Sequence, residues 1–360
     1  MTNKRCKIVS SFLIDTLFIL FNVSALITGC NSKYTVVPVT NYEQVNLVSD
    51  TAGYGNARID TNLLNAWGIA MSPTGVFWIA ANHSGTSAIY DNTGKQLLAS
   101  VKIPLGASPS GVIFNGTSDF TIPNNCVSLF IFSTEDGIIS AWNKNTGTTA
   151  VTVADRSSAG AVYKGLAMAN DGGANFIYAT DFHNGKIDVF DNNFALVTTK
   201  PFDDPGIPAG FAPFNIQNIG GQLYVTYAKQ LAPDNHDDDA APGNGYVDIY
   251  TAAGILVKRL ATQGTLNSPW GIAQVPSAAT SFGQATNAIL VGNFGDGHIN
   301  VFDSNGTFKG QLEGTGTPIS IPGLWAITFN PVSPADPNQL YFTAGPGDEA
   351  HGLFGYLKKM

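Results

Sequence analysis

Short apolar runs alternate with turn residues along most of the chain, and the clearest example is residues 289–306. Residues 289–291 form an apolar run that can be buried on both faces of a sheet, and a turn rich in Gly, Asn and Asp follows. Residues 298–302 alternate like a half-buried strand. Residues 303–306 are of the types that tolerate the left-handed backbone of a tight hairpin. This segment therefore predicts two strands and two turns.

The same pattern recurs at residues 78–94, 129–143, 176–191, 223–250 and 340–356. A second phrase of the type Trp-Gly-Ile-Ala precedes each copy, centred on Gly68, Gly111, Gly165, Asn215, Gly271 and Ala326. The successive spacings are 43, 54, 50, 56 and 55 residues. A period near fifty with three or four short strands is typical of propeller blades. The chain is therefore predicted to be all-β, a six-bladed β-propeller.

The repeats also predict the blade boundaries. The blades are expected at residues 64–100, 107–153, 162–200, 211–260, 266–312 and 322–357. The last copy leaves no room for its outermost strand, while residues 43–50 alternate like an edge strand. We predict that this N-terminal strand completes the sixth blade, so that the propeller spans residues 43–360 and has no long exposed sheet edge.

Residues 1–29 have the pattern of a secretory signal, with basic residues before a long apolar run. Cys30 follows Ile-Thr-Gly and resembles the acylated cysteine of the bacterial lipobox. A transmembrane anchor is the alternative because of the run's length, but Asp15 in its middle disfavours it. We expect residues 30–42 to be a polar tether on an exported bacterial lipoprotein. Asn31 favours the outer membrane or cell surface over the periplasmic face of the inner membrane.

Composition and charge limit the classes of partner that the chain is expected to bind. The chain has 39 Gly, 19 Pro and 44% hydrophobic residues, which suits a turn-rich fold with a large core. Cys126 is the one cysteine outside the predicted signal and lipidation site, so no disulfide framework is expected. A formal net charge of -8 opposes binding to nucleic acid and to anionic headgroups. We expect no nucleic-acid partner and membrane contact through the lipid alone.

Several long phrases resemble one protein family. They include NAWGIA, DFHNGKIDVFD, VGNFGDGHINVFD and DEAHGLFGY, and the likeness extends over residues 43–357. The family is an uncharacterised group of exported bacterial β-propellers, some with an exosortase-type C-terminal sorting tail, which the lipobox is expected to replace here. The phrases are more distantly similar to NHL-repeat propellers. The resemblance implies a fold and a compartment but no activity.

Polar residues recur just after the second strand of each predicted blade. In a closed ring these loops gather at one face, so we expect them to meet at the mouth of the central channel. The candidate residues are Asn82, His83, Glu135, Asp181, His183, Lys229, Asn293, Asp296, Glu349 and His351. Their oxygen atoms suit Ca²⁺, and the imidazoles admit Zn²⁺ or another divalent metal. The plainer alternative is that they hold turns or bridge neighbouring blades.

Trp67, Trp270 and Trp325 occupy matching places at the start of the innermost strand. Together they could form an aromatic platform for a sugar ring or an apolar ligand. Packing between adjacent blades is the favoured alternative.

An acidic insertion between residues 228 and 245 is the most polar part of the chain. Asp234, Asp237 and Asp239 are weak metal candidates there, because their spacing departs from that of an EF-hand loop. A solvated loop is the favoured interpretation. Asp91, Asp191 and Asp303, which precede hairpin turns, are predicted to be turn formers.

The common catalytic strings are missing from the sequence. It contains no Gly-x-Ser-x-Gly elbow, no His-Glu-x-x-His helix and no Gly-rich phosphate loop. We therefore predict a lipid-anchored envelope module that binds a small ligand or an envelope protein through loops at one face, rather than an enzyme. The alternative is a metal-dependent hydrolase or lyase with a site in the central channel, which rests on a likeness of fold to sugar-lactonase-type propellers.

Overall fold

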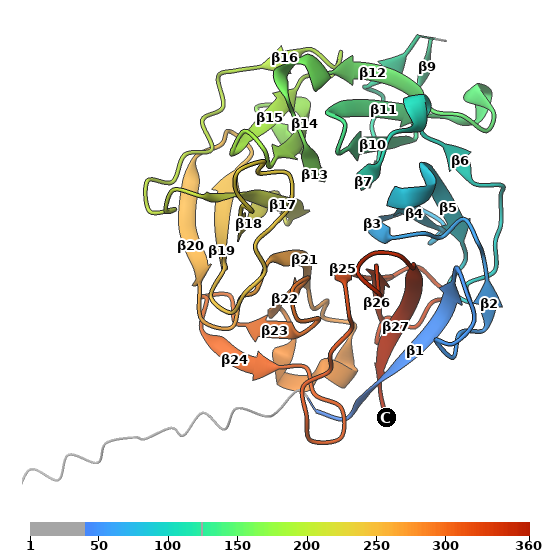
Figure 1. Cartoon of the computed structure of the whole chain (residues 1–360), viewed down its shortest axis with the longest axis vertical. Helices are drawn as coiled ribbons and strands as arrows, with labels where there is room; N and C mark the ends of the chain where they lie inside the picture. Colours follow the sequence, from blue (N-terminus) through green and yellow to red (C-terminus); the bar gives the residue numbers. More distant parts are fainter. Residues whose placement is uncertain (1–39, 124) are drawn as a thin grey trace, which may run out of the picture. The chain divides into compact units, whose positions relative to one another are not determined.

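The computed structural model describes residues 40–123 and 125–360, and most of the regular structure there is β-strand. Six small sheets form a ring (Figure 1), which confirms the predicted six-bladed β-propeller. Within the described residues, no helix has both the length and the apolar character needed to cross a bilayer. The predicted signal and Cys30 lie outside the described residues and stay predictions.

The first three blades are four-stranded antiparallel sheets in the predicted order. Blade one contains β3 (Ala66–Met71), β4 (Phe77–Ala81), β5 (Thr86–Tyr90) and β6 (Val101–Lys102). Blade two contains β7 (Pro109–Phe114), β10 (Phe130–Thr134), β11 (Ile138–Trp142) and β12 (Val151–Asp155). Blade three contains β13 (Tyr163–Asp171), β14 (Ala174–Asp181), β15 (Lys186–Phe190) and β16 (Leu196–Val197). A separate ribbon of β8 (Thr121–Ile122) and β9 (Cys126–Val127), which was not predicted, is inserted in blade two.

The other three blades repeat this arrangement. Blade four contains β17 (Phe211–Ile219), β18 (Gln222–Lys229), β19 (Gly245–Thr251) and β20 (Leu256–Thr262). Blade five contains β21 (Pro269–Gln274), β22 (Ile289–Asn293), β23 (Ile299–Phe302) and β24 (Phe308–Gln311). Blade six contains β25 (Leu324–Phe329), β26 (Leu340–Ala344), β27 (Leu353–Lys359), β1 (Tyr42–Ser49) and β2 (Arg58–Ile59).

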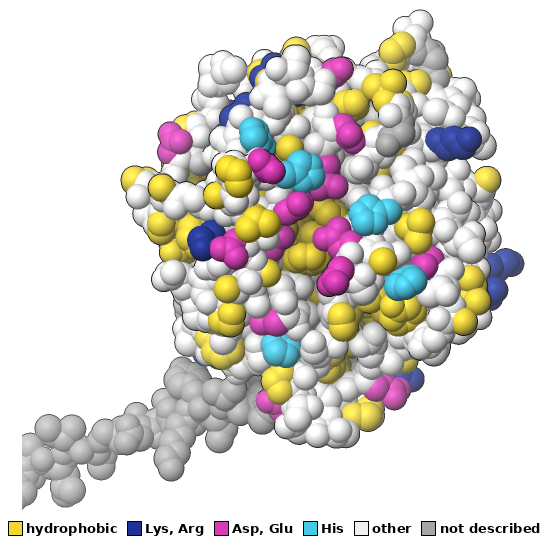
Figure 2. Space-filling model, viewed as in Figure 1, with side chains coloured by type: hydrophobic (Ala, Val, Ile, Leu, Met, Phe, Trp, Pro, Cys, Tyr) yellow, Lys and Arg dark blue, Asp and Glu magenta, His cyan; other side chains and the backbone are white. Residues whose placement is uncertain are grey.

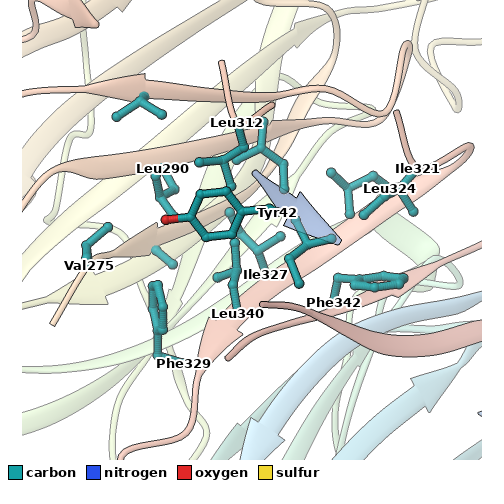
Figure 3. Packing of buried hydrophobic residues seen from close by; sticks show 14 of the residues in the cluster. Tyr42, Val275, Leu290, Leu312, Ile321, Leu324, Ile327, Phe329, Leu340 and Phe342 are labelled. Atoms are coloured by element: carbon teal, nitrogen blue, oxygen red, sulfur yellow. The ribbon is translucent and has the colours of Figure 1, made fainter. Parts of the chain in front are cut away.

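The N-terminal strand closes the ring, as predicted. β1 pairs antiparallel with β27 from Tyr42↔Lys359 to Ser49↔Leu353. The ring of Tyr42 inserts among apolar side chains of blades five and six (Figure 3), and the residue is 2% exposed. Its hydroxyl donates a hydrogen bond to the backbone oxygen of Ser281 at 3.2 Å. β2, which pairs parallel with β1, was not predicted.

Glycine at the centre of the Trp-Gly-Ile-Ala phrase lets the innermost strands approach one another around the axis. A Cβ atom on Gly271 would lie 2.5 Å from the backbone oxygen of Trp325, and one on Gly165 would lie 2.7 Å from Cα of Asn215. Neither contact is tolerable, so these positions require glycine. Blade four carries Asn215 instead, and its side-chain amide donates a hydrogen bond to the backbone oxygen of Trp270 at 2.7 Å.

The turns between the outer strands are built by the predicted aspartates. In each of Asp91, Asp191 and Asp303, Oδ1 accepts hydrogen bonds from the amides two and four residues later, at 2.8 to 3.0 Å. These bonds hold the chain in a tight reversal. The three residues are turn formers, as predicted.

Removing β1 should prevent the ring from closing. A chain that starts at Thr51 loses every pair between β1 and β27 and the buried ring of Tyr42, and it exposes the edge of β27. We expect it to aggregate, or to lose its cooperative thermal transition, in size-exclusion chromatography and circular dichroism. A chain that starts at Thr40 is the control and should behave like the full chain. A monomeric, cooperatively unfolding protein starting at Thr51 would contradict the closure.

Candidate functional site

Acidic and histidine side chains gather on one face around a central hollow, and hydrophobic atoms lie at the bottom of the hollow (Figure 2). All 5 histidines of the chain lie between the second and third strands of their blades. These loops share one face of a closed propeller. Loops that are far apart in the sequence therefore meet, as predicted, but only some of the predicted side chains do.

Five charged or titratable side chains meet at the centre of this face. We call Glu135, Lys164, His236, Asp237 and Glu349 the mouth cluster. Lys164 lies on β13, and the others follow β10, β18 and β26, so four blades contribute. The ammonium of Lys164 pairs with Oε1 of Glu135 and lies 3.4 Å from Oδ1 of Asp237.

Lys164 is the centre of the cluster. Its side chain is 3% exposed, and its ammonium lies 5.1 Å from the ring centroid of Trp67 and 6.0 Å from that of Phe182. Burial by itself lowers the pKa of Lys164, but the charges of Glu135 and Asp237 outweigh it and hold the pKa above its usual value. The mouth therefore favours positive charge strongly enough to keep a buried ammonium ionised.

The sequence-based predictions did not include Lys164 among the site residues, although the sequence contains a signal for it. Lys164 directly precedes Gly165, as Trp67 precedes Gly68 in blade one. Most other blades have an aromatic residue at this position. The lysine therefore places a charged side chain next to the apolar residues that surround the axis.

Residues of blade one support the two glutamates. The side-chain amide of Asn82 donates to Oε2 of Glu135 at 2.8 Å, and that of Asn65 donates to Oε2 of Glu349 at 2.6 Å. His83 Nε2 lies 3.9 Å from the same oxygen of Glu349. Burial raises the pKa of Glu349 to about 7, and the charge of Glu135 adds to the shift. Glu349 is therefore close to half-protonated at neutral pH.

The insertion after β18 brings His236 and Asp237 to the mouth. His236 Nδ1 lies 3.0 Å from Oδ1 of Asp237. This hydrogen bond raises the pKa of His236 and lowers the pKa of Asp237 to about 2. Ligand atoms of Glu135, His236 and Asp237 all lie within 4.8 Å of one another. One imidazole and two carboxylates are a set that divalent transition metals accept.

Other predicted residues hold the insertion in place. His183 Nδ1 lies 2.9 Å from the backbone oxygen of Asp234, and the ammonium of Lys229 donates to Oδ2 of Asp239 at 2.6 Å. The backbone amide of Asp239 also donates to the carbonyl of Lys229 at 2.7 Å. The favoured view of a solvated loop is thus incomplete, because the insertion is tied to blades three and four. Of its three candidate aspartates, only Asp237 enters the mouth cluster.

Strand register explains why Glu135 reaches the axis and Asp181 does not. In β10 the residue that faces the last position of the third strand is Phe130, and in β14 it is Ile177. Glu135 lies five residues after Phe130, and Phe182 lies five residues after Ile177, so Glu135 is equivalent to Phe182 rather than to Asp181. Successive strand residues point to opposite sides, so a shift by one residue directs the side chain away from the axis.

Asp181 instead serves its own turn. It is fully buried, and its two oxygens accept hydrogen bonds from the amide of Val162 at 3.1 Å and from the side chain of Asn184 at 2.8 Å. Its prediction as a channel-mouth ligand is therefore corrected to a structural role.

Asn293, Asp296 and His351 are likewise used locally. The amide of Asn293 donates to Oδ1 of Asp296 at 3.1 Å, and that oxygen also accepts from the backbone amide of His298 at 3.0 Å. His351 Nδ1 lies 2.9 Å from Oδ2 of Asp50, next to the closing strand. These residues hold turns and the blade-six seam, as the plainer alternative supposed.

The three predicted tryptophans meet, but they do not form a platform. Ring centroids are 3.9 Å apart for Trp67 and Trp325, 6.4 Å for Trp67 and Trp270, and 5.8 Å for Trp270 and Trp325. Their exposures are 1%, 1% and 4% for Trp67, Trp325 and Trp270. The buried rings leave no exposed platform, and the favoured alternative agrees with the contacts, because Trp325 of blade six packs against Trp67 and Trp270 of the two adjacent blades.

This aromatic cluster closes the central channel. Phe182 and Phe214 pack with the tryptophans, and Phe294 stacks on Trp325 at 4.0 Å. Below the rings, innermost strands of all six blades line a cavity of about 30 Å³, room for about one water. This part of the channel has no room for a ligand larger than water, whereas the mouth above the rings is open to solvent.

A groove of about 610 Å³ opens beside the mouth, between blades one and two. Asn82 and His83 line its inner end, and Lys102 and Leu105 line it further out. Asn82 contacts Glu135, so the groove leads directly to the mouth cluster. A ligand with one group in the mouth has space to extend there.

The pair of Lys164 and Glu135 should show strong energetic coupling. Changing Lys164→Met leaves the carboxylate of Glu135 in a site that is only 13% exposed. We expect a loss of about 3–5 kcal/mol in urea unfolding, because a buried charge loses its partner. Adding Glu135→Gln should restore a large part of that loss. Additive effects of the two changes would show that they do not form a coupled pair.

The matched control is Lys229→Met, which removes a more exposed pair. Lys229 and Asp239 are 44% and 40% exposed, and we expect a change below about 1 kcal/mol.

Sequence comparison finds relatives, although no protein-family model matches the chain. The chain is 33% identical over 337 residues to uncharacterized protein R648 of Acanthamoeba polyphaga mimivirus, covering 89% of this chain and 81% of that protein. It is 33% identical over 318 residues to uncharacterized protein L690 of the same virus, with 84% and 82% covered. These viral relatives do not support membership of an exported bacterial family, and the lipoprotein signal stays a prediction.

Comparison with solved structures finds other propellers. A streptogramin B lyase aligns with a TM-score of 0.52 at 14% identity, covering 88% of this chain and 97% of its own. The GH93 α-L-arabinofuranosidase of Fusarium graminearum gives 0.55 at 10% identity, with 88% and 97% covered. A protein of unknown function from Bacteroides thetaiotaomicron gives 0.57 at 10%, with 88% and 76% covered. At these identities the likeness shows the fold alone.

Proposed function

Because the chain belongs to the family of the mimivirus proteins R648 and L690, which brings no activity, we propose its function from its own mouth cluster. The chain is a binding module that takes a positively charged group of a ligand at the mouth of the central channel. The observation that carries this proposal is that Glu135 and Asp237 both pair with one buried ammonium, that of Lys164, with the carboxyl of Glu349 close enough to interact electrostatically with this pair.

The charges of the mouth are not balanced. Glu135 and Asp237 both pair with the one fixed ammonium, and the carboxyl of Glu349 interacts electrostatically with Glu135 and Lys164, so carboxyl groups outnumber the ammonium. A buried ion pair is maintained only where the local field compensates for lost hydration. A recess with low-dielectric walls and excess negative charge concentrates cations. The mouth thus attracts a second positive charge.

The mouth is accessible from solvent. The side chain of Asp237 is 67% exposed, and that of His236 is 47% exposed. A ligand can approach between the insertion and the groove beside Asn82 and His83. The groove would receive the rest of the ligand while the cationic group lies near Glu135 and Glu349.

Organic cations should therefore bind at the mouth. Choline and arginine amide are suitable probes, measured by isothermal titration calorimetry on EDTA-treated protein. Changing Glu135→Gln should weaken binding about tenfold or more, because a charge-assisted contact is lost. Glu43→Gln is the control, since Glu43 lies on β1 in an exposed pair with Lys358.

The affinity should also depend on pH. The pKa of Glu349 is about 7, so raising the pH from about 6 to about 8 removes its proton and adds negative charge. Binding should tighten over that range, and Glu349→Gln should reduce the change. Failure of both probes to bind, or equal affinity in Glu135→Gln, would refute the proposal.

Export and lipid attachment at Cys30 form a further part of the proposal. They would place the module at the cell envelope, where a small ligand or an envelope protein could reach the mouth. Expressed in a bacterium, the full chain should fractionate with membranes and incorporate labelled palmitate, and Cys30→Ala should abolish the labelling. Labelling that persists in Cys30→Ala would refute the anchor.

A further inference from the structure

We propose that Glu135, His236 and Asp237 form a binding site for a divalent transition-metal ion such as Zn²⁺ or Mn²⁺. The inference rests on the proposed function, and it narrows the cation taken at the mouth to a metal ion. The ligand atoms of these three residues lie within 4.8 Å of one another, so small side-chain rotations bring them onto one ion. An imidazole with two carboxylates suits a transition metal better than Ca²⁺, which prefers oxygen ligands alone.

The three ligands come from two independent parts of the fold. Glu135 follows β10 in blade two and is held by the amide of Asn82 at 2.8 Å. His236 and Asp237 lie on the insertion of blade four, which is tied to the end of β18 by the backbone and side-chain bonds between Lys229 and Asp239. A metal ion bound here would join the insertion to blade two.

Lys164 occupies the place that the ion would take. Its ammonium contacts two of the three ligands, Glu135 and Asp237. The second contact, at 3.4 Å, is long for a charge-assisted hydrogen bond. The faces of Trp67 and Phe182, at 5.1 and 6.0 Å, offer the ammonium another favourable surface. Metal ion and ammonium therefore compete for the same carboxylates.

Two polar side chains near the mouth, which lack close hydrogen-bond partners, are a second observation. Oδ2 of Asp238 is shielded from solvent and has no hydrogen-bond partner within residues 40–123 and 125–360. Oγ of Ser268, a fully buried residue, also lacks a close partner there, and the side chains of Asp238 and Ser268 lie near enough to interact with each other. Ser268 precedes Pro269-Trp270 as the mouth residue Asn65 precedes Ala66-Trp67. Buried polar atoms without partners indicate a missing ligand or water, and the bound waters of a metal ion would supply partners.

The test uses the full chain, stripped of metal with EDTA and titrated separately with Zn²⁺, Mn²⁺ and Ca²⁺ by calorimetry. We expect one equivalent of Zn²⁺ or Mn²⁺ to bind and Ca²⁺ to bind more weakly. His236→Ala should weaken the metal about tenfold or more, and Lys164→Met should tighten it, because the competing ammonium is gone. His298→Ala, which alters a histidine of the same face outside the cluster, is the control.

Each result supports or overturns the inference. Opposite effects of His236→Ala and Lys164→Met support it, since a purely structural role would not tighten binding. No stoichiometric metal, or equal affinity in His236→Ala, overturns it. If choline or arginine amide still binds in that case, the proposed cation-binding function stands without the metal, and if neither binds, both proposals fail. His236 is exposed on the insertion, and circular dichroism of its variant confirms that the fold is retained.

Discussion

The pairing of β1 with β27 is the contact on which the rest of the structure depends. It joins the two ends of the chain in one sheet and turns a row of blades into a ring. Blade six then lies beside blade one, and Asn65 bonds both Glu349 and the indole of Trp325 across that seam. Without the closure the aromatic cluster could not form, because it takes residues from blades one and six, and Glu349 of the mouth cluster would lose its hydrogen bond from Asn65 of blade one.

The centre of the ring is filled in two ways, by aromatic packing toward the interior and by paired charges at the mouth. Toward the interior, Trp67, Trp270 and Trp325 exclude water and pack face to edge. At the mouth, Lys164 replaces the aromatic residue of the repeat and introduces a charge that costs several kcal/mol to bury alone. Glu135 and Asp237 offset that cost. The carboxylates are therefore both a structural requirement and the chemistry of the proposed site.

Equivalent positions in the repeat serve different purposes. Asn82, Glu135 and Phe182 occupy one register position, and the first two bond to each other while the third packs in the aromatic cluster. The residues one place earlier point the other way, as Asp181 does when it binds its own turn. The side chains around the axis therefore differ from blade to blade, while the backbone arrangement of the blades stays the same.

The sequence by itself determined the class of fold, the number of blades and the closing strand. These follow from local properties that act over a few residues, since the apolar alternation repeats six times and turn aspartates recur in three blades, at Asp91, Asp191 and Asp303. Gathering of the loops at one face followed from the repeat as well. The predicted candidates Glu135, Glu349 and Asp237 do gather at the mouth, although the prediction mixed them with residues that serve local turns.

Only the tertiary structure decided which of those side chains meet. A strand residue points toward or away from the axis according to a register that changes with one residue, and the sequence did not resolve this for Asp181 or Asn293. The role of Lys164 depends on neighbours 29 and 73 residues away, which no local pattern reveals. The channel is likewise closed because tryptophans of three blades meet on the axis. Whether they meet depends on how close the ring brings the blades, which the sequence pattern does not give.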